Sequence, residues 1–162
     1  MRAWIGLGAN LGDARQTLRS ALAALAALPG SRWVARSSLY RTAPVDAAGA
    51  DYVNAVALIE TSLDAERLLR ALQAIEARHG RQRPFRNAPR TLDLDLLLHG
   101  DAVIATPALT VPHPRLHQRA FVLVPMAEIG ARLGEAVVVP GRGPLAALLA
   151  AVAGQRVDRL DE

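Results

Sequence analysis

The chain contains 162 residues, and 19 basic against 15 acidic side chains give it a formal net charge of +4. Every basic residue is an arginine, so the absence of lysine excludes a phosphate-binding-loop lysine, a kinase strand lysine and a Schiff-base lysine. The absence of cysteine excludes a disulfide framework and thiolate chemistry. If a protein of this composition handles phosphates, arginine and metal must do so, and the planar arginine fork suits phosphate oxygens.

Length and hydropathy predict a single domain over residues 1–162. Apolar residues make up 51% of the chain, which is enough to form a sizeable core at this length. No apolar run approaches the roughly 20 residues that a membrane-spanning helix needs. The first residues are typical of a strand rather than a signal peptide, so we expect a cytoplasmic protein.

Residue periodicity predicts an alternation of strands and helices. The expected strands are 2–8, 32–41, 52–60, 92–98, 102–105 and 137–139. The expected helices are 14–28, 64–79, a segment that ends near 129, and 144–153. Up to residue 98 this order is βαββαβ, which indicates an α+β fold: a ferredoxin-like core with an additional C-terminal strand and helices, arranged as an αβα sandwich.

Three glycines follow or interrupt the first expected strand. Gly6, Gly8 and Gly12 are similar to a dinucleotide-binding fingerprint, but their spacing is one residue longer than G-x-G-x-x-G. No acidic residue ends a second parallel strand at the distance that fingerprint requires. We therefore interpret the glycines as a tight strand-to-helix turn, with Asp13 as the helix N-cap.

Two aspartates stand out in the expected strand 92–98. Leucine and aspartate alternate there with period two, so Asp93 and Asp95 share one face and Leu92, Leu94 and Leu96 the other. Strand geometry separates the two acidic positions by roughly 6–7 Å. Two adjacent carboxylates repel each other unless positive charge lies between them, which arginine or a divalent metal could supply. The alternative is a half-exposed strand whose polar face happens to carry two acids.

Segment 81–90 precedes this strand and contains four arginines and two prolines. A basic loop joined to a diacid strand could bind a polyphosphate through metal and guanidinium groups; a solvated basic loop is the alternative. Gln73 and Glu76 share one helix face, as an ordinary surface pair also would. His113 lies between two prolines, so we expect it to donate to an anion rather than to form a helical metal pair with His117.

Residues 86–97 (RNAPRTLDLDLL) resemble the signature of the 6-hydroxymethyl-7,8-dihydropterin pyrophosphokinase family. Further matches follow in family-like order and extend the resemblance from residue 1 to about 130. They are 8–12, 40–42, 51–55, Gln73 with Glu76, Arg81 with Arg83, and 109–113 with Arg119 and Phe121. The resemblance implies transfer of pyrophosphate from ATP to 6-hydroxymethyl-7,8-dihydropterin, with release of AMP, in folate (tetrahydrofolate) biosynthesis.

The resemblance also implies a role for each matching residue. Asp93 and Asp95 would be catalytic and would hold two magnesium ions on the ATP triphosphate. The other catalytic residues implied are Arg81, Arg83 and Arg90. The implied ATP contacts are Gln73, Glu76, Arg83, Leu96, Thr110, His113 and Arg119. The implied pterin contacts are Thr42, Val45, Tyr52, Asn54 and Phe121. A monomer that binds neither nucleic acid nor membrane is expected.

Two positions depart from the family pattern. Asn87 occupies a position where many members carry tryptophan, so we expect either Phe85 to take over its role or a looser closure over the pterin. Ala108 replaces a basic residue of some members, which removes one expected phosphate contact.

A different class of protein, an RNA-binding domain, also combines such a sheet with positive charge. The chain has only two Phe, two Tyr and two Trp for base stacking, and acids on a central strand would repel RNA.

Overall fold

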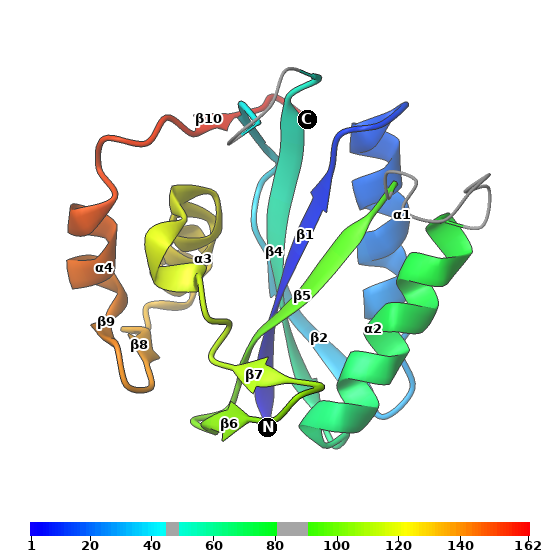
Figure 1. The fold of residues 1–162 in the computed structure, drawn as a ribbon, viewed down its shortest axis with the longest axis vertical. Helices are drawn as coiled ribbons and strands as arrows, with labels where there is room; N and C mark the ends of the chain where they lie inside the picture. The colour runs from blue at the N-terminus through cyan, green and yellow to red at the C-terminus, as the bar shows by residue number, and fades with distance from the viewer. Residues whose placement is uncertain (45–48, 81–90) are drawn as a thin grey trace.

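The computed structural model describes residues 1–44, 49–80 and 91–162. Within them, a six-stranded sheet lies between two layers of helices (Figure 1). The strands are β1 (Arg2–Ala9), β2 (Ser31–Arg36), β3 (Tyr40–Thr42), β4 (Tyr52–Thr61), β5 (Asp93–His99), β6 (Ile104–Ala105), β7 (Thr110–Val111), β8 (Val138–Val139), β9 (Gly143–Pro144) and β10 (Asp158–Arg159). The helices are α1 (Ala14–Ala26), α2 (Ala65–His79), α3 (Ala120–Leu133) and α4 (Leu145–Ala151), with a 3₁₀ turn at Leu116–Gln118. No helix of these described ranges is long and apolar enough to cross a membrane.

The main sheet has the strand order β10-β3-β4-β1-β5, and β2 pairs with β4 next to β3. All strand pairs described in it are antiparallel. Helix α1 connects β1 to β2 across β4, and α2 connects β4 to β5 across β1. This is the ferredoxin-like arrangement, so the predicted fold class is confirmed. An antiparallel sheet also removes the dinucleotide-binding alternative, which needs parallel strands.

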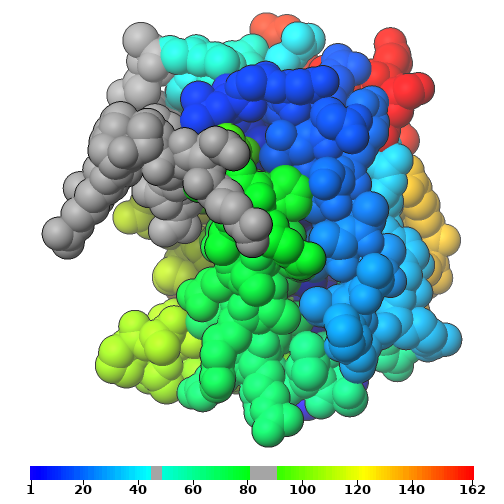
Figure 2. Space-filling model, turned by 90° about the vertical axis from the view of Figure 1, so that its right-hand side faces the viewer, coloured from blue at the N-terminus to red at the C-terminus, as the bar shows by residue number. Residues whose placement is uncertain are grey.

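Helices cover both faces of the sheet. Helices α1 and α2 lie side by side over one face, which is the side turned toward the viewer in Figure 2. Their buried side chains recur at helical spacing and include Leu18, Leu25, Leu68, Leu72 and Ile75. Helix α3 packs Leu123, Met126 and Ile129 against the other face, and α4 packs outside it. Each such buried side chain contributes about 1.5–3 kcal/mol to folding.

Helices α1 and α2 each begin after an aspartate, a residue type that is common at helix N-caps. Asp13 accepts a hydrogen bond from the Gln16 backbone N–H at 3.2 Å, as predicted for an N-cap. Asp64 accepts one from the Arg67 backbone N–H at 2.8 Å. Helix α1 ends at Ala26, two residues before the predicted end at 28. Gly12 has φ +58°, which is the conformation that the turn between β1 and α1 requires of it.

The predicted strand over 32–41 is wrong, because the chain breaks into β2 and β3 there. Ser37 interrupts it: its backbone N–H donates to the Val56 carbonyl at 2.9 Å, and its hydroxyl accepts from the Val56 N–H at 2.9 Å. A side-chain oxygen thus takes the place of a backbone carbonyl in the ladder. The residues between β2 and β3 have no strand geometry of their own, so β3 starts afresh at Tyr40.

Four other features of the structure differ from the predicted elements. Strand β5 ends the sheet, so the diacid strand is an edge strand and not a central one. Strand β6, within the predicted strand 102–105, pairs with β7 in a separate two-stranded sheet. Helix α3 continues to Leu133, beyond the expected end near 129. The pairing of β10 with β3 has no counterpart in the predicted elements.

Candidate active site

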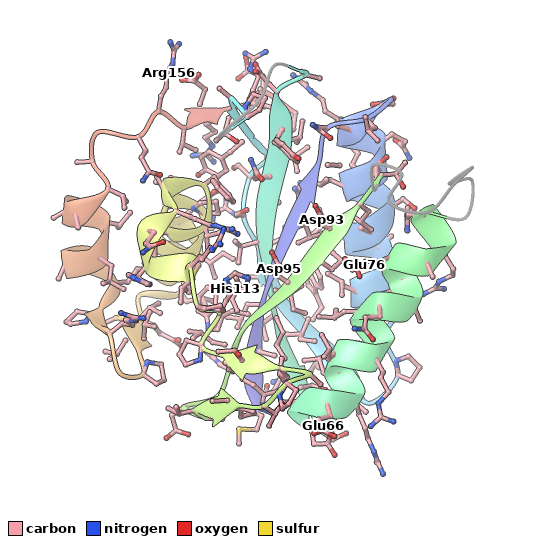
Figure 3. The ribbon with its side chains drawn as sticks, viewed as in Figure 1. Glu66, Glu76, Asp93, Asp95, His113 and Arg156 are labelled. Atoms are coloured by element: carbon pink, nitrogen blue, oxygen red, sulfur yellow. The ribbon has the colours of Figure 1, made fainter. Side chains whose placement is uncertain are left out.

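The two aspartates of β5 lie on the sheet face that α3 covers. Leu94 and Leu96 point into the core under α1 and α2, so the alternate positions Asp93 and Asp95 face the other way. In the register with β1, Asp93 lies opposite Gly8 and Asp95 opposite Gly6. The aspartates follow one another along β5 (Figure 3). The apolar core under α3 therefore has acidic instead of apolar side chains at these two positions, and a cavity occupies this end of the face.

This first cavity has a volume of about 340 Å³. It lies between the ends of β1, β3, β4 and β5 and the start of α3. Its lining comprises Gly6, Leu7, Gly8, Thr42, Ala43, Pro44, Tyr52, Asn54, Ala55, Asp93, Asp95, Arg119, Phe121 and Val122. The residues expected at the pterin, apart from Val45, therefore lie together with both aspartates. Val45 lies outside the described residues.

Asn54 is held in one orientation at the base of this cavity. It is only 5% exposed, and its Nδ2 donates to the Thr42 Oγ1 at 2.8 Å. A Cβ atom placed at Gly8 would come within 3.2 Å of the Asn54 Oδ1. The Asn54 amide thus fills the space that the missing side chain of Gly8 leaves. Thr42 and Gly8 together determine where its polar atoms lie.

Sequence reasoning missed Gly6 and Gly8 as lining residues of the site, because it explained both as part of a tight strand-to-helix turn at the end of the expected strand 2–8. Both are inside β1, and both line the first cavity. A usable signal was present, since glycine inside a strand often marks close approach of a ligand or another group.

A second cavity of about 250 Å³ lies on the other side of Asp95. Its lining comprises Leu69, Leu94, Asp95, Leu96, Pro107, Ala108, Leu109, Thr110, His113 and Pro114. Three of the expected ATP contacts, Leu96, Thr110 and His113, line it. Asp95 is the one residue of the described chain in the lining of both cavities. The position of Ala108 is also in this lining, which is where a longer basic side chain would reach.

Gln73 and Glu76, also expected at the nucleotide, are not among the residues lining this second cavity. Glu76 instead reaches from α2 to the edge of β5 (Figure 3). Its Oε2 accepts a hydrogen bond from the Leu94 backbone N–H at 2.8 Å. Leu94 lies between the two aspartates, so Glu76 holds the strand segment that carries both.

His113 faces Asp95 across the second cavity. Its Nε2 lies 3.9 Å from the Asp95 Oδ1, and the side chain is 20% exposed. The backbone N–H of His113 donates to the Leu97 carbonyl at 3.0 Å, which ties it to β5. The Arg115 backbone N–H donates to the Nδ1 at 3.2 Å. Since Nδ1 accepts, the proton of the neutral ring lies on Nε2 and points toward the anionic side of the cavity.

Burial lowers the pKa of His113, and the positive charges of Arg119 and Arg115 lower it further against the opposing effect of Asp95. The neutral ring with its Nε2 proton is therefore the form present at neutral pH. Arg119 itself lies at the start of α3, where its guanidinium carbon is 5.4 Å from the centre of the Phe121 ring. This cation–π contact places a positive group and an aromatic ring together in the lining of the first cavity.

Carboxylate oxygens are the ligands that magnesium prefers, so Asp93 and Asp95 fit that ion. No group of three or more His, Asp or Glu side chains with metal-binding geometry occurs within residues 1–44, 49–80 and 91–162. A pair of carboxylates is sufficient for magnesium that also takes water and phosphate ligands. The three arginines expected at the phosphates, Arg81, Arg83 and Arg90, lie outside the described residues, as does Asn87.

Sequence comparison relates this chain to known enzymes. The family profile of 7,8-dihydro-6-hydroxymethylpterin-pyrophosphokinase (HPPK) matches residues 4–131. The 2-amino-4-hydroxy-6-hydroxymethyldihydropteridine pyrophosphokinase of Pseudomonas aeruginosa is 42% identical over 160 residues, which make up 98% of this chain and 96% of that relative. The protein of the same name from Haemophilus influenzae is 46% identical over 132 residues, covering 81% of this chain and 82% of that relative.

Structural comparison finds the same fold in a more distant protein. The Plasmodium falciparum HPPK-DHPS crystallised with pteroate aligns with a TM-score of 0.71 and 12% sequence identity. The alignment covers 94% of this chain but only 42% of that longer one, and at this identity it supports the fold alone. The sequence matches are decisive, because the family profile covers residues 4–131 and the Pseudomonas aeruginosa relative is 42% identical over 98% of the chain. The chain belongs to the 7,8-dihydro-6-hydroxymethylpterin-pyrophosphokinase family.

Proposed function

We propose that this chain transfers the pyrophosphoryl group of ATP to 6-hydroxymethyl-7,8-dihydropterin in folate biosynthesis. The observation that carries the proposal is the position of Asp95 between two cavities, one suited to a flat polar ring and one at the expected nucleotide contacts. Two substrates bound there would meet at the carboxylates. Family membership supports the same reaction, since the named relatives are pyrophosphokinases of this pterin.

In this proposal the pterin occupies the first cavity. The Asn54 amide hydrogen-bonds the edge of the pterin ring, in the orientation that Thr42 and Gly8 impose. Tyr52 and Phe121 contact the ring faces or edges. Val45 contributes a backbone contact. The ring would bind with its hydroxymethyl group toward Asp93 and Asp95, because these acids lie at the side of the cavity that adjoins the second one.

ATP occupies the second cavity in this proposal, with Leu96 and Thr110 at its nucleoside. Gln73 and Glu76 would contact the nucleotide from α2, outside the lining of that cavity. The triphosphate lies near His113 and Arg119, which neutralise charge together with Arg81, Arg83 and Arg90. The neutral His113 donates its Nε2 proton to a phosphate oxygen, an interaction compatible with its lowered pKa.

The reaction joins the hydroxymethyl oxygen of the pterin to the β-phosphorus of ATP. The bond between that phosphorus and the oxygen that bridges it to the α-phosphorus breaks, AMP leaves with this oxygen, and the hydroxyl proton passes to water. Two magnesium ions held by Asp93 and Asp95 would supply charge neutralisation and lower the pKa of the attacking hydroxyl. The residues of the chain contribute positioning and electrostatic stabilisation, which dominate phosphoryl-transfer catalysis. We further propose that the chain acts as a single-domain cytoplasmic monomer, without nucleic acid or membrane partners.

Phosphorus NMR of the purified protein with ATP, magnesium and the pterin tests this function directly. The expected products are AMP and a pterin diphosphate, and EDTA abolishes both. Production of ADP instead would mean γ-phosphoryl transfer and would contradict the proposed reaction.

A pair of variants tests the site. Asp95→Asn should reduce turnover by about 100-fold or more, because it removes a charged group that acts at the reacting phosphate. Asp101→Asn is the matched control: it removes an equal charge from an exposed turn just after β5. Equal activities of the two variants would refute the role given to Asp95.

A further inference from the structure

The break between β2 and β3 leaves two consecutive backbone N–H groups without partners in the sheet ladder. Both donate to carboxylates from distant parts of the chain. The Ser38 N–H donates to the Glu128 Oε1 at 2.8 Å, and the Leu39 N–H donates to the Glu162 Oε2 at 3.2 Å. Partly buried backbone donors are costly when unpaired, so these carboxylates are what makes this break stable.

Glu128 is the centre of a larger network on α3. Its side chain is only 10% exposed and also accepts from the Ser38 hydroxyl at 2.8 Å and from the Tyr40 hydroxyl at 2.7 Å. Arg132 and Arg159 form ion pairs with it. Burial by itself raises the pKa of Glu128, but the hydrogen bonds from Tyr40 and Ser38 outweigh it and hold the pKa below its usual value. The charged carboxylate therefore persists at neutral pH.

The last residues hold β3 from its other edge. Strand β10 pairs with β3, and the Leu160 N–H donates to the Leu39 carbonyl at 2.9 Å. The Leu160 side chain is buried in the core under α1 and α2. Glu162 forms an ion pair with Arg36 at 2.8 Å. In Figure 2 the last residues, in red, adjoin the blue N-terminal part of the chain, and Arg15 donates there to the Asp161 carbonyl at 3.0 Å.

These contacts matter for the site because β3 is short and ends in the first cavity. Its three residues run from Tyr40, which is bound to Glu128, to Thr42, which holds Asn54. Helix α3 contributes the opposite wall of the same cavity through Phe121, two turns before Glu128. Glu128 thus connects the two walls of the cavity to each other.

We propose that Glu128 and Glu162 are positioning residues that hold β3, and through it Thr42 and Asn54, in the geometry that pterin binding needs. This inference rests on the proposed function. It assigns a role in substrate recognition to carboxylates that do not line either cavity. It also gives β10 a role, although β10 lies beyond residue 131, where the family match ends.

Separate binding measurements for the two substrates test this inference. Glu128→Gln in the full chain keeps the side-chain shape but removes the charge that Arg132 and Arg159 neutralise. We expect its dissociation constant for the pterin to rise about fivefold or more, by analogy with other remote positioning residues. The dissociation constant for a non-hydrolysable ATP analogue with magnesium should stay unchanged, since the second cavity does not contact this network. Calorimetry measures both constants on the same preparation.

Glu135→Gln provides the matched control, because it also removes a carboxylate that pairs with an arginine (Arg2) near α3, but on the exposed surface. It should leave both dissociation constants unchanged. Tyr40→Phe and Glu162→Gln remove smaller parts of the network, and we expect them to weaken pterin binding selectively even if Glu128→Gln does not fold.

Three results would overturn the inference. Unchanged pterin affinity in well-folded Glu128→Gln and Tyr40→Phe would show that the network only stabilises the fold. Equal losses for both ligands would indicate a general loss of structure. A wild-type chain that binds ATP but no pterin would overturn the proposed function and this inference together. If the wild-type chain is active on the pterin but the variants bind it normally, only the positioning role is refuted.

Discussion

Substitution of Gly8 by alanine tests how the first cavity is built. The new Cβ would lie 3.2 Å from the Asn54 Oδ1, so the amide has to move by a few tenths of an ångström. Asn54 is buried and bound to Thr42 at 2.8 Å, and this shift would stretch or break that hydrogen bond. The φ of Gly8 is outside the left-handed region, so the backbone itself accepts alanine.

The cost of this displacement is about 1–2 kcal/mol, the range expected when a buried hydrogen bond is weakened. If the pterin uses the same amide, its binding weakens by about five- to thirtyfold. The free energy of unfolding should change less than the pterin-binding free energy. Alanine restricts the conformations of the unfolded chain, which stabilises the folded state by about 0.4–1 kcal/mol and offsets part of the cost. Gly8→Ala therefore separates function from folding.

Gly6→Ala is the matched control in the same strand and cavity. Its Cβ would meet only Leu97 side-chain carbons, at 3.4, 3.5 and 3.6 Å, which is ordinary van der Waals contact for a flexible side chain. We expect it to weaken pterin binding less than Gly8→Ala does. Calorimetric titration with the pterin and thermal unfolding of both variants provide the comparison. The reasoning is refuted if Gly8→Ala binds the pterin as tightly as wild type, or no more weakly than Gly6→Ala.

Two further predictions concern β5 and its surroundings. Glu76→Ala leaves the Leu94 N–H without this acceptor and should lower the free energy of unfolding by about 1–2 kcal/mol. Urea unfolding measures it against Glu66→Ala, which removes an exposed carboxylate of the same helix; equal losses would contradict the bracing of β5 by Glu76. At pH values between the lowered pKa of His113 in the folded state and its usual value of about 6.5, the unfolded state binds more protons than the folded state. The free energy of unfolding should therefore rise with pH over this range. Urea unfolding at several pH values should show this slope in the wild type and a shallower one in His113→Gln; identical slopes would contradict burial as the cause.

The local sequence pattern was sufficient to predict the features that depend only on residues close together in the chain. The alternation of leucine and aspartate predicted β5 and placed both acids on one face, because strand geometry requires it of any such sequence. Asp13 was recognisable as an N-cap for the same reason: its partner, Gln16, lies three residues away. The order of strands and helices then limited the fold to the ferredoxin-like class.

The break at Ser37 could not be predicted in this way. Residues 32–41 alternate like one strand, but the interruption depends on Val56, which lies 19 residues further along the chain. The two carboxylates that stabilise the break, Glu128 and Glu162, are more distant still. Sequence alone gives no measure of which remote side chain will reach a free backbone donor.

The amino-acid sequence by itself determined the class of fold, the family, and the residue types that could bind metal and phosphate. Only the tertiary structure decided that Asp95 lies between two cavities, that Gly8 makes room for the Asn54 amide, and that Glu128 joins two walls of the first cavity. The physical reason is that secondary structure follows from contacts between near neighbours in the chain. A binding site depends on side chains that only the packing of the sheet and its two helical layers brings together.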